Sequence, residues 1–395
     1  MKISGIRTYT VSVATTHHPR DLQTGELLAS KSKTWLFLKI ETDRGIHGWG
    51  DGSGEWLAPS VEPTLHDWKD LLVGQDPLKV VALSEDIANR LPWKGGATYG
   101  TAIAAINMAL YDIAGKAWGV PVHTILGGSR RDRVRVYSNG GSFESPELAV
   151  RNALKWKAKG YSGIKGNPLE NRTWPLDHAA VEHSVACVKA VREAVGDGFD
   201  ILLDTHGSPN PEIALDLARS VAPYRPLFLE EPVKLGSIDA LAEVSLKSPI
   251  PIATGEKIFT VQDFVAIIDR RACAILQPDL THCFGITTTV EIARRAEHAQ
   301  MHMAPHAVCN PVGQAATLHA DAVMNNFLIQ ETTGVFFEQY DRFAEHDMKV
   351  CDGYMNIPDR PGLGVEVKEQ DIARMPHEPM AYRQYRHADG SWKGW

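Results

Sequence analysis

Three short stretches in the middle of the chain, ILLDTHG (201–207), LFLEEP (227–232) and IATGEK (252–257), each place an acidic residue after an apolar run. These residues are Asp204, Glu230 and Glu256, with a spacing of 26 residues from 204 to 230 and again from 230 to 256. A strand, a helix and their two loops need roughly thirty residues. The spacing therefore predicts successive βα units that bring three carboxylates to one place.

Three carboxylates without a thiolate form a ligand set that suits Mg²⁺, which prefers oxygen donors and keeps positions open for water or substrate. We therefore predict one Mg²⁺ per subunit, held by Asp204, Glu230 and Glu256. Acidic residues at these places also fit ordinary helix N-caps. The equal register of all three favours the metal site.

The same alternation of strand and helix patterns extends from about residue 131 to residue 345. Strand-like runs such as VRVYS (134–138), SGIK (162–165) and CAILQPD (273–279) alternate with helical runs, in about eight steps. Eight βα steps predict an α/β fold, a (β/α)8 TIM barrel with its chemistry at the carboxyl ends of the strands.

The flanking regions follow other patterns. Residues 1–130 contain strand-like runs at 3–13 and 34–50 and a helical run at 101–118, which predicts an α+β capping domain. Residues 346–395 resemble loop and strand more than a further βα unit, and we expect this segment to pack back on the capping domain.

Composition excludes several functional classes. A net charge of −7 and a pI near 6.1 give no electrostatic footprint for nucleic acid. The first ten residues, MKISGIRTYT, lack the apolar region of a signal peptide, and no apolar run is long enough to span a membrane. We therefore expect a cytoplasmic protein with no nucleic-acid or membrane partner.

An ordered set of motifs covers nearly the whole chain: IKGN (164–167), LLDTHG (202–207), FLEEP (228–232), TGEK (254–257), ILQPDLTH (275–282), APH (304–306) and IQE (329–331). With the capping domain, this set resembles the mandelate-racemase-like branch of the enolase superfamily, and within it the D-galactonate dehydratases. The resemblance implies a Mg²⁺ enzyme that removes the proton α to a carboxylate and stabilises the resulting enediolate, with a Lys or His base.

His306 is the expected general base, because APH ends the predicted seventh strand and an imidazole accepts a proton near pH 7. Asp279 closes the sixth strand and would orient the imidazole and stabilise the imidazolium. The family's dyad falls on these motif positions. A structural histidine and a capping aspartate are the alternative interpretation.

His206 follows Asp204 by two residues, so strand alternation predicts that both side chains enter the site. Strands three and seven lie opposite each other in an eight-stranded ring, so His206 and His306 would approach a substrate from opposite sides. The resemblance assigns His206 the acid that protonates a departing β-hydroxyl. Alternatively, His206 only holds a metal ligand in place.

Two polar residues close the second strand. Racemases of this branch carry Lys-x-Lys there, whereas this chain has Lys165 and Asn167, and an amide cannot act as a second base. Lys165 is then a fixed cation near the substrate carboxylate, and Asn167 a substrate contact. The resemblance also implies that Glu331, in the eighth strand, hydrogen-bonds the enediolate as a protonated acid.

Substrate specificity is expected to depend on the capping domain, because a long segment from His17 to Ser32 would close over the site. Its candidate substrate contacts are His17, His18 and Arg20, joined by Trp56. The resulting hypothesis is a dehydratase that converts a small polyhydroxy carboxylate to its 2-keto-3-deoxy product, in a homo-oligomer. The alternatives are a racemase, epimerase or cycloisomerase of the same superfamily, and a barrel that binds ligand without catalysis.

Overall fold

The computed structural model describes residues 1–15, 32–90, 92–169, 178–378 and 389–391. Its amino-terminal region begins with a three-stranded antiparallel sheet, in the order β1 (Ile3–Ala14), β2 (Ser32–Thr42) and β3 (His47–Asp51). Helices follow this sheet: α1 (Ala58–Asp67), α2 (Lys69–Leu72), α3 (Val80–Arg90), α4 (Ala97–Trp118) and α5 (Val122–Ile125). Helix α4 is almost entirely buried and ends at Gly119, whose φ of 71° closes it with a left-handed residue.

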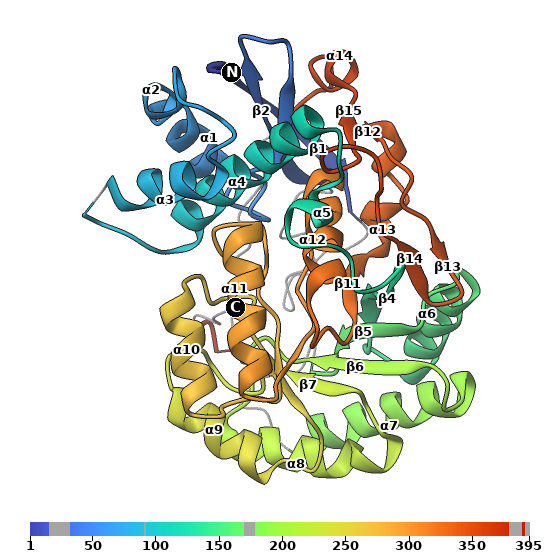
Figure 1. The fold of residues 1–395 in the computed structure, drawn as a ribbon. Helices are drawn as coiled ribbons and strands as arrows, with labels where there is room; N and C mark the ends of the chain where they lie inside the picture. The colour runs from blue at the N-terminus through green and yellow to red at the C-terminus, as the bar shows by residue number, and fades with distance from the viewer. Residues whose placement is uncertain (16–31, 91, 170–177, 379–388, 392–395) are drawn as a thin grey trace.

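The second region is a closed ring of parallel strands, drawn in green to orange in Figure 1. The strands are β4 (Arg133–Ser142), β5 (Gly163–Asn167), β6 (Asp200–Asp204), β7 (Phe228–Glu230), β8 (Ile252–Thr254), β9 (Ile275–Leu276), β10 (His302–Met303) and β11 (Gln330–Thr333). Strand β11 pairs with β4, and Met303 of β10 bonds to Asn326 and Leu328 just before β11, which closes the ring. The predicted (β/α)8 barrel with an α+β cap is confirmed.

Helices cover the outside of the ring, and their starts match the sequence. They are α6 (Pro146–Ala158), α7 (His178–Val195), α8 (Pro211–Val221), α9 (Ile238–Lys247), α10 (Val261–Asp269), α11 (Ile286–His298) and α12 (Pro311–Val323). Side-chain N-caps begin five of them, at Ser145, Asn210, Ser237, Thr260 and Asn310. Among the described residues no helix is long and apolar enough to cross a membrane.

The carboxyl-terminal region contacts both of the others. Its elements are α13 (Gly334–Phe337), β12 (Ala344–Glu345), β13 (Val350–Cys351), β14 (Tyr354–Asn356), β15 (Glu366–Val367) and α14 (Glu369–Ile372). Strand β14 extends the barrel sheet beside β4, while Glu366 accepts hydrogen bonds from Trp49 and Lys116 of the capping region. The exact division at residues 130 and 345 remains a prediction.

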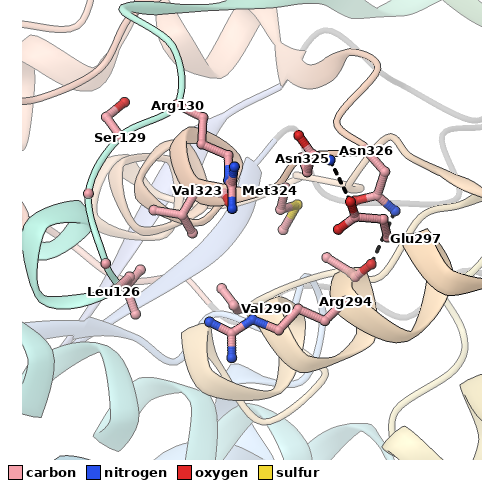
Figure 2. A pocket seen from close by; sticks show the side chains of 13 residues that line it. Leu126, Ser129, Arg130, Val290, Arg294, Glu297, Val323, Met324, Asn325 and Asn326 are labelled. Atoms are coloured by element: carbon pink, nitrogen blue, oxygen red, sulfur yellow. Dashed lines mark hydrogen bonds between the residues drawn. The ribbon is translucent and has the colours of Figure 1, made fainter.

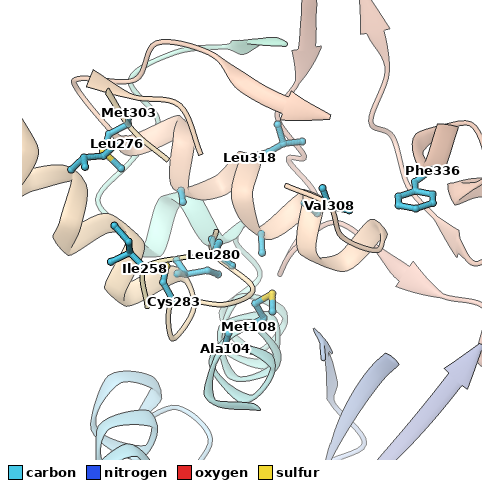
Figure 3. Close-up of a cluster of buried hydrophobic side chains, with 14 of the residues drawn as sticks. Ala104, Met108, Ile258, Leu276, Leu280, Cys283, Met303, Val308, Leu318 and Phe336 are labelled. Atoms are coloured by element: carbon cyan, nitrogen blue, oxygen red, sulfur yellow. The ribbon is translucent and has the colours of Figure 1, made fainter. Parts of the chain in front are cut away.

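The cap and the barrel share one hydrophobic core. In Figure 3, Ala104 and Met108 of α4 lie beside Leu280 and Cys283, in the loop that follows β9. The approach is close at Gly100, where a Cβ would lie 2.1 Å from the backbone oxygen of His282. The capping region therefore packs directly on the loops that follow the carboxyl ends of the barrel strands.

Candidate active site

Charged and polar side chains collect at the carboxyl ends of the barrel strands, which we call the mouth. Lys165 projects from β5, Asp204 and Glu230 end β6 and β7, and Glu331 projects from β11. All four are at most 3% exposed. Because parallel strands of a barrel bring their carboxyl ends together, residues distant in sequence meet here.

The first group in the mouth is a candidate metal site. Asp204, His206 and Glu256 each offer a ligand atom, and these atoms lie within 4.8 Å of one another. Two carboxylates and an imidazole suit a divalent cation. The Nε2 of His206 lies 3.0 Å from the Oδ2 of Asp204.

The route by which His206 reaches this group differs from the expectation. Strand β6 ends at Asp204, and His206 lies in the following turn with a φ of 50°. Strand alternation was therefore the wrong reason, although it gave the right place. Burial disfavours the imidazolium, but the Asp204 and Glu256 carboxylates outweigh it and raise the pKa of His206 to about 9.

Glu230, the remaining predicted metal ligand, is engaged by other side chains. Its two carboxylate oxygens lie 3.0 and 2.9 Å from the Nζ of Lys165, and Oε2 also accepts a hydrogen bond of 2.8 Å from Gln277. Burial and the nearby Asp204 raise the pKa of Glu230 well above its usual range, against the effect of Lys165. Its role as a metal ligand stays a prediction.

Lys165 is the cation at the centre of the mouth. Its Nζ lies 2.9 Å from Glu230, 3.2 Å from Glu331 and 3.5 Å from Asp204. Burial opposes its charge, but these carboxylates raise the pKa of Lys165 well above its usual range. A solvated lysine at a strand end is therefore excluded. The side chain of Asn167 instead turns to its own loop, where Oδ1 accepts a hydrogen bond of 2.8 Å from the Leu169 amide.

His306 and Asp279 form a dyad on adjacent segments that are joined by a parallel bridge. The Nδ1 of His306 lies 2.6 Å from the Oδ2 of Asp279, whose Oδ1 accepts hydrogen bonds from the amide and hydroxyl of Thr281. Burial opposes ionisation of Asp279, but His282 and His306 hold the pKa of that carboxyl well below its usual range. An ionised carboxylate only accepts, so Nδ1 carries the proton.

The other nitrogen of the His306 ring faces the mouth. Its Nε2 lies 3.5 Å from Glu256 and 3.9 Å from Glu331. Burial lowers the pKa of His306, but the carboxylates of Glu331, Glu256 and Asp279 raise it by more. The pKa of His306 therefore lies well above its usual range. His306 can therefore exchange a proton with a group in the mouth through Nε2.

The structure describes one of the four residues that were expected to contact the substrate from the capping domain. His17, His18 and Arg20 lie outside the described residues. Trp56 is described, and its ring lies 5.4 Å from the Nζ of Lys33. Its place in the mouth of the barrel stays a prediction.

Sequence reasoning missed Glu55, which pairs with Lys33 at 2.9 Å. Burial raises the pKa of Glu55, but Lys33, His306 and His282 outweigh it and lower the pKa to about 2. The capping region therefore faces the dyad with a carboxylate. Only its position shortly after the strand-like run 34–50 could have suggested this. Gln277 was also missed, although it precedes Asp279 by two residues and alternation predicts that it faces inward.

A separate pocket of about 400 Å³ lies away from the mouth (Figure 2). Its walls are α11 and two segments, 126–130 and 323–326, that lead into β4 and β11 at their amino ends. Arg130 at its rim donates a hydrogen bond of 3.1 Å to the backbone oxygen of Val323 and so serves as a cap for α12. None of the predicted site residues that the structure describes lines this pocket.

Comparison with known proteins gives a consistent assignment. Residues 5–127 match the mandelate racemase/muconate lactonizing enzyme N-terminal domain, and residues 148–371 match the enolase C-terminal domain-like family. A D-galactonate dehydratase of Ralstonia nicotianae is 38% identical over 370 residues, which is 91% of this chain and 96% of the relative. A D-galactonate dehydratase of Variovorax paradoxus is 37% identical over 369 residues, with the same coverage.

Solved structures agree. A proposed dehydratase from Mesorhizobium loti is 30% identical with a TM-score of 0.85, over 94% of this chain and 98% of that one. An enolase from Agrobacterium radiobacter with sodium and L-malate bound is 26% identical with a TM-score of 0.85, over 99% of each chain.

Proposed function

The chain belongs to the enolase superfamily, with a mandelate racemase/muconate lactonizing enzyme N-terminal domain, and from this premise we propose that it is a Mg²⁺-dependent sugar-acid dehydratase. The observation that carries the proposal is the meeting of the His306–Asp279 dyad and His206 around one group of carboxylates. Such a mouth holds both a base and an acid, which a β-elimination of water requires.

The proton transfers can be assigned to particular atoms. Nε2 of His306 removes the proton α to the substrate carboxylate, while Asp279 stabilises the imidazolium through Nδ1. The electrons left at the α-carbon expel the β-hydroxyl, which leaves as water with a proton from His206. The enol that remains tautomerises to a 2-keto-3-deoxy acid. Nε2 of His206 lies 3.0 Å from Oδ2 of Asp204, so this imidazole lies at the same group of carboxylates as the dyad, where it can act as the acid.

A divalent cation fits the donor set of the mouth. We propose Mg²⁺ held by Asp204, Glu230 and Glu256; when bound, it would stabilise the negative charge that grows on the substrate carboxylate. Lys165, whose Nζ lies 2.9 Å from Glu230, would stabilise the same charge. The positive charge of such a cation would also offset the carboxylates that hold His306 protonated.

The ligand set can be tested by metal binding alone. We expect Glu230→Gln to weaken Mn²⁺ binding, used as a probe for Mg²⁺, by at least about tenfold and to abolish turnover. His206→Asn, which removes only the contact of His206 with Asp204, should weaken binding less than Glu230→Gln does, while turnover is lost. Calorimetric titration of both variants checks this. If His206→Asn loses the ion and Glu230→Gln keeps it, the ligands are Asp204, His206 and Glu256 instead.

Substrate identity is the finer part of the proposal. The D-galactonate dehydratases among the relatives point to a six-carbon sugar acid. A panel that contains D-galactonate, its epimers and the corresponding dicarboxylates, incubated with Mg²⁺ and semicarbazide, reports 2-keto acids directly. Exchange or inversion at the α-carbon without a keto acid would favour a racemase or epimerase, and binding without either would favour a non-catalytic barrel. The homo-oligomeric state and the cytoplasmic location stay predictions.

A further inference from the structure

Asp51, at the end of β3 in the capping region, is a buried carboxylate to which the chemistry above gives no role. It is 0% exposed. Its Oδ2 accepts a hydrogen bond of 2.8 Å from the Asn310 amide, and its Oδ1 accepts hydrogen bonds of 2.8 and 2.5 Å from the amide and hydroxyl of Ser53. Both oxygens are therefore committed, one to the barrel and one to the capping region.

The barrel partner of Asp51 belongs to the segment that carries the base. Residues 306–310 read HAVCN and connect His306 to α12, and the segment contains no glycine. Asn310 caps α12 through its own side chain, which accepts hydrogen bonds from the amides of Val312 and Gly313. Because Pro311 follows, the backbone of Asn310 is restricted to extended conformations. A shift at Asn310 would therefore be passed along a short and stiff segment to His306.

Two further hydrogen bonds hold this segment from outside the capping region. The amide of Ala307 donates a hydrogen bond of 3.2 Å to Glu331, and the hydroxyl of Tyr340 donates one of 3.0 Å to the backbone oxygen of Cys309. The capping region reaches this segment at Asn310, whose side chain donates hydrogen bonds of 3.4 and 3.5 Å to the Leu36 oxygen and the Ser53 hydroxyl. The Asp51 bond of 2.8 Å to the Asn310 amide is the shortest of these links. It is also the one that involves an ionised acceptor outside the mouth, and such bonds are roughly twice as strong as neutral ones.

Helix α12 reinforces the preference for a charge at Asp51. A Cβ on Gly313, in the first turn of α12, would lie 2.6 Å from the Oδ2 of Asp51. The carboxylate therefore packs directly on the amino end of a 13-residue helix, where a negative charge is favourable. Burial nevertheless raises the pKa of Asp51 to about 6, against the hydrogen bonds from Ser53 and Asn310. The folded protein thus keeps the Asp51 carboxylate in a buried place where its ionisation costs free energy.

We propose that Asp51 is a positioning residue that fixes the base His306 from the capping region, through its hydrogen bond to the Asn310 amide. The inference rests on the proposed function, because it needs His306 to be the base. Its consequence is that the cap does more than cover the substrate. A displacement of about 1 Å in a reacting group can lose roughly a hundredfold in rate, so the link sets the rate of proton removal rather than substrate affinity.

The test compares Asp51→Asn with Ser53→Ala at pH 8, where Asp51 is ionised. The side-chain amide in Asp51→Asn keeps one acceptor oxygen. Its NH2 group faces the backbone N–H of either Asn310 or Ser53, so one of these two hydrogen bonds is lost. Ser53→Ala removes the hydroxyl bond to Asp51 and the 3.5 Å contact with the Asn310 side chain, but it leaves the bond between Asp51 and the Asn310 amide intact, so it is the control for that bond. The first readout is the proton NMR resonance of the His306 Nδ1–H in the resting enzyme, identified by its loss in His306→Asn. This readout needs no substrate.

We expect the resonance to shift or broaden in Asp51→Asn and to stay in place in Ser53→Ala. An unmoved resonance in folded Asp51→Asn overturns the inference. If Asp51→Asn fails to fold, Asp51→Ser gives the same readout with a smaller side chain whose hydroxyl can donate or accept.

The second readout is steady-state kinetics on the panel acid that wild-type enzyme dehydrates. We expect kcat to fall about 10- to 100-fold in Asp51→Asn with KM within about threefold, and to change less than about threefold in Ser53→Ala. An equal fall in both variants would mean a structural role only. If wild-type enzyme dehydrates nothing, the proposed function has failed, and the resonance still decides the place of Asp51.

Discussion

Two layers inside the barrel differ sharply although the same strands build them. The lower layer is apolar and is formed by Tyr137, Leu202, Phe228, Ala253, Ile275, Ala304 and Ile329. The upper layer is the mouth, and four of its members, Asp204, Glu230, His306 and Glu331, follow members of the lower layer by two residues. Strand alternation therefore points both layers inward.

The difference between the layers shows how stability and chemistry are separated along a strand. The lower layer removes apolar surface from water and stabilises the barrel. The mouth places Lys165 among three buried carboxylates, an arrangement whose desolvation cost is large and which stabilises a fold poorly. We expect substitutions in the mouth to change chemistry first and those in the lower layer to change stability first.

The largest expected effect comes from Lys165→Met. It leaves Asp204, Glu230 and Glu331 without their cation, so we expect a loss of about 3–5 kcal/mol in the free energy of unfolding of metal-free protein, and no measurable turnover. Urea unfolding at pH 7.5 measures the first and the keto-acid assay the second. Lys247→Met, at an exposed pair with Glu243 on α9, is the control and should cost about 1 kcal/mol at most. Normal turnover in folded Lys165→Met would break the comparison.

Phe228→Ala tests the lower layer. The side chain is fully buried, so its loss should cost about 3–5 kcal/mol in the free energy of unfolding. The kcat of the folded enzyme should change by less than about tenfold, because Glu230 keeps its bonds to Lys165 and Gln277. Phe228→Leu should lose less stability and less activity than Phe228→Ala. A variant with full stability but no turnover would show that the two layers are not separable.

Site residues that lie in or next to regular strands could be predicted from the sequence, whereas those placed by turns or by packing between elements could not. Asp204, Glu230 and the dyad were predictable, because apolar runs and alternation place them. The turn at His206 was not, because alternation no longer applies once β6 has ended. The Lys165–Glu230 pair depends on side-chain geometry between strands, and the approach of Glu55 depends on how the cap packs on the barrel. Neither leaves a local pattern.

Two buried histidines extend the comparison to a smaller effect, because their surroundings shift their pKa values in opposite directions. His306 sits among carboxylates, whereas His319 of α12 is buried between His123 and the Leu363 backbone oxygen, and burial lowers its pKa to about 3. An unfolded chain, with an ordinary histidine pKa near 6.5, therefore binds more protons than the folded one between those values, and stability falls as pH falls. At pH 5 the loss is about 2 kcal/mol.

Urea unfolding at pH 7.5 and pH 5 measures this effect when wild-type protein is compared with His319→Phe. The variant should lose the His319 share of the pH dependence. His298→Gln, on the exposed end of α11, is the control and should retain it. Equal pH dependence in His319→Phe and wild-type protein would contradict the assignment.

The central claim is that His306 removes the α-proton and His206 protonates the leaving hydroxyl. Both steps separate when His206→Asn and His306→Asn are incubated in deuterated water with Mg²⁺ and the sugar acid that wild-type enzyme dehydrates, with α-deuterium followed by NMR. We predict that His206→Asn exchanges the α-proton while dehydration falls by about 10²- to 10⁴-fold, and that His306→Asn does neither. Exchange that is lost in His206→Asn and retained in His306→Asn would contradict the account and reverse the two roles.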